Sequence, residues 1–67
     1  MGWTAQQTAL NQMQERYGDS GYTVDHLHYK MVGFFRPANK GRSSQRIFAI
    51  GNTWKEALRE LERKAAA

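Results

Sequence analysis

Hydrophobic and polar positions divide the chain into two helical stretches that flank a central stretch rich in β-branched and aromatic residues. In the first stretch, apolar side chains recur at a spacing that aligns them along one side of a helix, opposite Gln and Asn: Trp3, Leu10, Met13 and Tyr17. The sequence Gly-Asp-Ser-Gly at residues 18–21 is typical of a turn. The pattern predicts a helix over residues 3–17.

Residues 22–36 predict extended structure, because most of their side chains are β-branched or aromatic. This segment is long for one strand, since about five or six residues are usual. We therefore expect two strands that turn near residues 25–28, and one bent strand with a bulge at Gly33 is the alternative. The polar residues 37–44 predict a hairpin loop, and residues 45–50 predict a further strand.

A second helix is predicted over residues 53–66. It begins at a capping box, in which the Thr53 hydroxyl and the Glu56 carboxylate each accept a hydrogen bond from a backbone N–H. Its apolar face comprises Trp54, Ala57, Leu58, Leu61 and Ala65. The element order αβββα predicts an α+β fold with two helices packed on one face of a three-stranded antiparallel sheet.

The predicted core joins apolar residues of both helices to one face of the sheet. It consists of Leu10, Met13, Trp54, Leu58 and Leu61 over Val24 and either Ile47 or Phe48. Trp54 and the aromatic side chains of the strands fit the core better than base-stacking surfaces. Phe34 and Phe35 are adjacent in a strand and therefore point to opposite faces, so one of them can be exposed.

Length and composition limit the class of protein. The 67 residues form at most one small domain, residues 1–67, and the absence of cysteine excludes disulfides and thiolate metal sites. No apolar run approaches the roughly 18 residues that span a bilayer, and the N-terminus lacks a secretory signal pattern. We expect a cytoplasmic protein with no membrane partner and no cofactor.

The charge of the chain is concentrated in one segment. Ten Lys and Arg against six Asp and Glu give a net charge of +4. Residues 36–46, which we call the basic segment, contain no acid and carry four of the cations: Arg36, Lys40, Arg42 and Arg46. The rest of the chain is balanced, so this segment is where an anionic partner would bind, although a solvated hairpin loop fits it equally well.

Sequence features of an enzyme are few. Ser43 or Ser44 could combine with His26 or His28 as nucleophile and base, but no nucleophile-elbow or phosphate-loop motif accompanies them. The two histidines could share a strand face and hold a metal with Asp25, although solvated or partly packed imidazoles fit this spacing better. We expect no catalysis, no metal site and no small-molecule substrate.

Two motifs resemble the double-stranded-RNA-binding domain. Residues 8–12 (Thr-Ala-Leu-Asn-Gln), followed by Gly18 and Tyr22, are similar to the opening of that domain, and residues 51–57 (Gly-Asn-Thr-Trp-Lys-Glu-Ala) are similar to the start of its last helix. In that family the first helix and the loop between the first two strands enter minor grooves, while cations at the last helix contact phosphates. The resemblance implies nucleic-acid contacts by Thr8, Asn11, Gln12, His26, His28, Lys55 and Arg59.

The residue types suit these implied contacts. Thr8, Asn11 and Gln12 are spaced i, i+3 and i+4, which places them on one helix face, where they can bond 2′-hydroxyls and base edges. Lys55 lies in the first turn of its helix, where the positive end of the helix dipole supports phosphate binding. The same polar residues also fit the solvated side of an amphipathic helix.

The chain departs from the family pattern at several positions. The family's Gly-Pro-x-His loop is absent, with His26 or His28 as the only stand-in, and Trp54 and Gln12 replace a usual lysine and a usual acid. Antiparallel pairing also places the basic segment at the sheet end opposite the family's phosphate contacts. The resemblance therefore leaves the basic segment unexplained.

These observations favour a non-catalytic nucleic-acid-binding module, with duplex RNA as the leading ligand. The alternative is a small phage- or plasmid-encoded protein that binds and modulates a host protein or nucleoprotein complex, with Trp3 as a core residue or as an apolar anchor for the partner.

Overall fold

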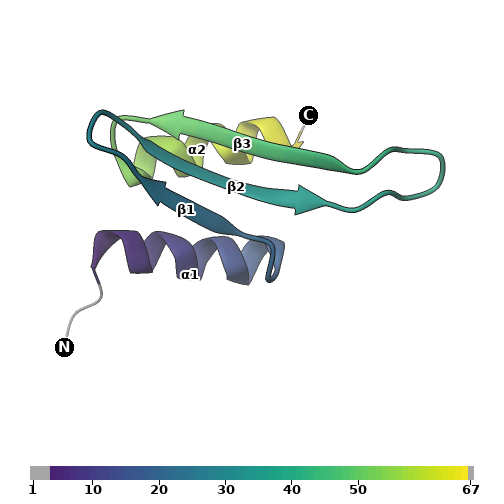
Figure 1. Ribbon diagram of the computed structural model, residues 1–67, viewed down its shortest axis with the longest axis horizontal. Coiled ribbons are helices and arrows are strands. Elements are labelled where there is room, and N and C mark those ends of the chain that lie inside the picture. The colour runs from purple at the N-terminus through teal and green to yellow at the C-terminus, as the bar shows by residue number, and fades with distance from the viewer. Residues whose placement is uncertain (1–3, 67) are drawn as a thin grey trace.

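The computed structural model describes residues 4–66. Its elements follow the order α1 (Ala5–Tyr17), β1 (Tyr22–Asp25), β2 (Lys30–Arg36), β3 (Gln45–Gly51) and α2 (Trp54–Ala66) (Figure 1). The strands form an antiparallel sheet in the order β1-β2-β3, which confirms the predicted αβββα fold. Trp3, which the hydrophobic pattern assigned to the first helix, lies outside the described residues.

The central stretch forms two strands joined by a short turn at residues 26–29. β1 pairs with β2 from Tyr22 opposite Gly33 to Asp25 opposite Lys30. β2 pairs with β3 along the whole length of both strands. This register decides which side chains share a face, because directly opposed residues point to the same side of a sheet.

Both helices begin at side-chain caps. The Thr4 hydroxyl accepts a hydrogen bond from the Gln7 N–H at 3.0 Å, so α1 begins at Ala5. At α2, the Thr53 hydroxyl accepts from the Glu56 N–H at 3.1 Å, and the Glu56 carboxylate accepts from the N–H of Asn52 at 2.9 Å. The capping interaction expected at Thr53 and Glu56 is therefore present, although the carboxylate bonds the residue before Thr53.

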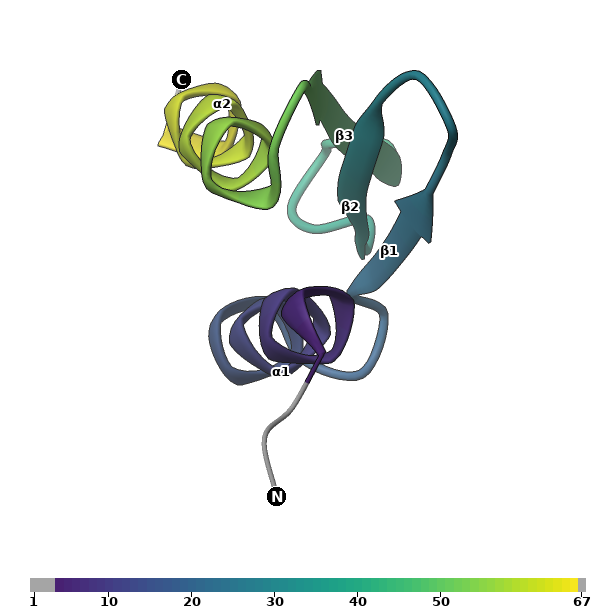
Figure 2. The same cartoon turned by 90° about the vertical axis from the view of Figure 1, so that its left-hand side faces the viewer.

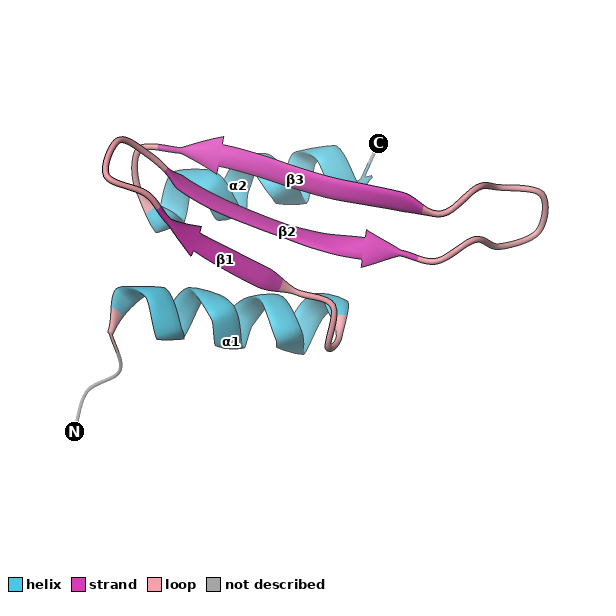
Figure 3. Ribbon diagram, viewed as in Figure 1, coloured by secondary structure: helices cyan, strands magenta, loops and turns pink. Residues whose placement is uncertain are grey.

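The two helices pack side by side on one face of the sheet, as the end-on view in Figure 2 and the colouring in Figure 3 show. The buried cluster draws on α1, β2, β3 and α2 and consists of Met13, Val32, Phe34, Ala49, Ala57 and Leu61. Tyr17 extends it, because its ring stacks on Phe34 with the centroids 4.2 Å apart. Ile47, Trp54 and Leu58 are partly buried against the same cluster.

The predicted core was wrong at Val24, which is exposed. Of the two alternatives on β3, Ile47 packs against the core and Phe48 is exposed. In the observed register Val24 lies opposite Met31 and Phe48 opposite Gly33, on the face that the helices do not cover. On α1 the buried partner of Met13 is Ala9, whereas Leu10 is only half-buried.

The β2–β3 connection projects beyond the helices along the 43 Å long axis of the molecule (Figure 1). Asn39 and Arg42 exchange two backbone hydrogen bonds, and the residues between them, Lys40 and Gly41, have φ values of 41° and 84°. Positive φ at both central positions is the requirement of a type I′ hairpin turn. Within residues 4–66, no helix is long and apolar enough to cross a membrane.

Candidate nucleic-acid interface

Two adjoining surface grooves lie between α1 and α2, and Gln12 of α1 and Lys55 of α2 line both of them. Thr8 lines the groove nearer the start of α2, and Arg59 lines the other. Four of the residues singled out from the sequence thus come together from two elements. Asn11 lines neither groove; it is half-buried, and its side-chain oxygen accepts a hydrogen bond from the Gln7 amide at 3.1 Å.

The charges of these interhelix grooves are partly paired. Arg16 on α1 bonds Glu62 on α2 at 2.9 Å, and this contact raises the pKa of Arg16. Lys55 and Arg59 are exposed and form no ion pair with any other residue of the span 4–66. They therefore carry the available positive charge of the grooves, where Glu15 is an opposing carboxylate.

Two backbone N–H groups around the start of α2 are already hydrogen-bonded within the chain, so they are not free to bind an anion at Lys55. The Glu56 N–H is already bonded to Thr53, and the Asn52 N–H is already bonded to the Glu56 carboxylate. The partial positive charge of the helix N-terminus still adds to the Lys55 ammonium. The exposed side chain of Lys55 is thus a donor beside the positive end of the helix.

His26 and His28 lie in the β1–β2 turn rather than on a strand face. The His26 ring stacks on Tyr29 with the centroids 4.4 Å apart, and its Nδ1 accepts a hydrogen bond from the His28 N–H at 3.3 Å. Leu27 between them is 88% exposed. No group of three or more His, Cys, Asp or Glu side chains suited to a metal ion occurs among the described residues.

The β1–β2 turn lies at the same end of the sheet as the start of α2. Lys30, the first residue of β2, pairs with Gly51, the last residue of β3, and its ammonium lies 5.7 Å from the centroid of the Trp54 ring. Figure 1 shows the turn, the end of β3 and the start of α2 together at this end. The histidines are therefore near the same end as the groove that Thr8 and Lys55 line.

The basic segment lies at the opposite end, where Arg36, Lys40 and Arg42 line a groove of their own. Arg36 is half-buried and donates to the Ala65 carbonyl at 3.0 Å, which ties β2 to the end of α2. The other three cations of the segment are exposed. Ser43 and Ser44 also lie in this connection, so the fold separates them from the two histidines.

Apart from Arg46 and the exposure expected for Phe34 or Phe35, sequence reasoning named no candidate site residue on the sheet face that the helices leave uncovered. We call this the open sheet face; it comprises Tyr22, Val24, Met31, Gly33, Phe35, Arg46, Phe48 and Ile50. The alternation of Phe34 and Phe35 was the one available indication, since Phe34 is 5% exposed and Phe35 is 44% exposed.

In comparisons with protein-family models, with curated proteins and with solved structures, no match to this chain was found. The functional argument therefore rests on the residues of the chain itself.

Proposed function

We propose that the chain is a non-catalytic nucleic-acid-binding module that binds duplex RNA across α1, the start of α2 and the β1–β2 turn. One observation carries the proposal: Thr8 and Gln12 of α1 line adjoining grooves with Lys55 and Arg59 of α2. A-form RNA is recognised mainly by shape, through its 2′-hydroxyls and phosphates. Short polar groups beside exposed cations supply both kinds of contact.

Each side chain has a definite role in this proposal. The Thr8 hydroxyl and the Gln12 amide donate to and accept from 2′-hydroxyls and base edges. Lys55 and Arg59, one helical turn apart, bind phosphates. The β1–β2 turn, with its exposed imidazoles, meets the same duplex further along its axis, and the RNA ligand implies a cytoplasmic location.

The phosphate contacts are tested by measuring the duplex-RNA Kd over a range of salt concentrations. Lys55→Ala with Arg59→Ala is expected to reduce the slope of log K against log salt by about one for each phosphate that is no longer neutralised. Lys40→Ala with Arg42→Ala is the matched control, because it removes the same charge at the opposite end of the molecule and should leave the slope unchanged. Equal slopes for the wild type and both variants would overturn the proposal.

The polar contacts of α1 need a separate test. Thr8→Ala with Gln12→Ala is expected to weaken duplex-RNA binding while the salt slope stays the same, because neither side chain is charged. Both residues are exposed, so circular dichroism and thermal melting should show an intact fold. Unchanged affinity in the folded variant would remove α1 from the interface and favour a protein partner.

A further inference from the structure

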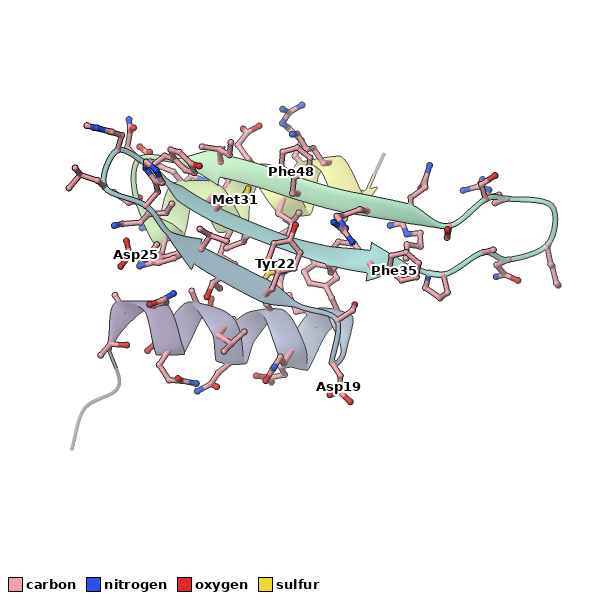
Figure 4. The ribbon with its side chains drawn as sticks, in the orientation of Figure 1. Asp19, Tyr22, Asp25, Met31, Phe35 and Phe48 are labelled. Carbon is pink, nitrogen blue, oxygen red and sulfur yellow. The ribbon has the colours of Figure 1, made fainter. Side chains whose placement is uncertain are left out.

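The open sheet face presents aromatic side chains to solvent. Phe35 and Phe48 are 44% and 45% exposed, and Tyr22 is half-buried beside them. Tyr22 and Phe48 lie on either side of Gly33 in one row of the sheet. Figure 4 shows Tyr22, Phe35 and Phe48 over the three strands on the side facing the viewer, away from α2.

Gly33 lets the Tyr22 ring lie flat across the central strand. A Cβ on Gly33 would be 2.6 Å from Tyr22 Cζ, so no larger residue fits beneath the ring in this position. The backbone of Phe35 is held by Ser20, whose hydroxyl accepts from the Phe35 N–H at 3.1 Å and donates to the Phe35 carbonyl at 3.2 Å. The backbone that carries Phe35 is thus fixed at this end of β2.

The charges around these rings favour an anionic partner. Arg46 is exposed directly opposite Phe35, and Lys64 places its ammonium 5.5 Å from the centroid of the Phe48 ring. The only carboxylate within the three strands belongs to Asp25, which lies opposite Lys30 on the other face. A second copy packed on this face would bury Arg46 without a carboxylate partner from the strands, which is costly.

We propose that the open sheet face and the basic segment together bind single-stranded nucleic acid. Bases stack on Tyr22, Phe35 and Phe48, and phosphates bind Arg46 and the hairpin cations Lys40 and Arg42. Stacking on aromatic side chains along a positively charged surface is the general way in which proteins bind single strands. This site is separate from the interhelix grooves, and it gives a role to the charges that the duplex interface does not use.

The stacking is tested with single-stranded RNA and DNA oligonucleotides of about 12 nucleotides that contain a fluorescent adenine analogue. Phe35→Leu with Phe48→Leu keeps apolar side chains but removes the rings, and it is expected to weaken binding by roughly 10- to 100-fold. Phe35→Tyr with Phe48→Tyr is the matched control and should retain both the affinity and the quenching of the analogue. The RNA and DNA arms show whether the sugar is also recognised.

The phosphate-binding cations have their own variant. Lys40→Ala with Arg42→Ala should reduce the salt slope for the single strand by about 0.7 for each phosphate that is no longer neutralised. Lys55→Ala with Arg59→Ala should leave this slope unchanged, although the same variant is expected to weaken duplex binding. The two variants therefore distinguish a failure of the single-strand proposal from a failure of the duplex proposal.

Three results would overturn the single-strand proposal. Wild-type affinity in the leucine variant would show that the rings do not stack on bases. Absence of single-strand binding by the wild type, under conditions where the fold is intact, would show that this face does not bind single strands. A concentration-dependent dimer in sedimentation velocity that the leucine variant abolishes would assign the face to a second copy of the chain.

Discussion

At the scale of single residues, Gly33 is a position where no side chain fits. A Cβ there would meet Tyr22 Cζ at 2.6 Å and the Ile47 carbonyl oxygen at 2.9 Å, so Gly33→Ala must displace a ring and strain the backbone beside β3. We expect it to lower the free energy of unfolding by about 1–3 kcal/mol, the usual cost of overpacking. Adding Tyr22→Ala to the Gly33→Ala variant should restore only the part of the lost stability that comes from the clash with the Tyr22 ring.

Urea denaturation of the two single variants and the double variant measures this coupling. Additive changes in the free energy of unfolding would show that the Tyr22 ring does not cover Gly33. The comparison also bears on the proposed stacking site, because the same contact sets the position of Tyr22.

Residue-scale features differ in how far a sequence reveals them. The capping residues Thr53 and Glu56 were predictable because they are three positions apart and act locally. The contact of Tyr22 with Gly33 was not, because it depends on the register of two strands. The same limit applies to Arg36. Its sequence context suggested a cation that binds a ligand, but its side chain bonds the Ala65 carbonyl of α2.

At the scale of elements, the turn of the basic segment holds Lys40 in a backbone conformation that lysine disfavours. Lys40 has a φ of 41°, a conformation that favours Gly and Asn over other residues. Lys40→Asn should therefore raise the free energy of unfolding by about 0.5 kcal/mol, or the melting temperature by about 2–4 °C. Lys40→Ala is the control, since it removes the same charge without easing the backbone. Equal stabilisation by both would assign the effect to charge.

The elements themselves were predictable, but the face that each presents was less so. Periodicity and turn residues indicated the two helices and three strands, and the element order indicated that Lys55 and the histidine turn share one end of the sheet. Val24 was assigned to the core, and Ile47 and Phe48 were left as alternatives, because apolarity alone does not show which side of a strand is covered. The aromatic open sheet face became visible only once the register was known.

At the scale of the whole molecule, the proposed ligands belong to different faces. The interhelix grooves lie in the helical layer, and the aromatic rings lie on the far side of the sheet (Figures 2 and 4). Neither surface takes a buried side chain from the core cluster. Substitutions of the exposed ligand-contacting side chains on one surface are therefore expected to leave both the fold and the other surface intact, unlike substitution of the buried Gly33.

The separation of fold from surface leads to a prediction about stability. Leu61 of α2 is 0% exposed in the core cluster, and Leu61→Ala should cost about 2–5 kcal/mol. The core of so small a domain rarely supplies more than about 3–5 kcal/mol in total, so this variant should be largely unfolded at room temperature. Phe48→Ala removes a larger side chain from the open sheet face, yet it should cost less than about 1 kcal/mol, because that side chain is 45% exposed and meets only cross-strand neighbours and the Lys64 ammonium. Urea denaturation followed by circular dichroism at two protein concentrations compares the variants, and destabilisation of equal size would show that the open sheet face is buried in solution.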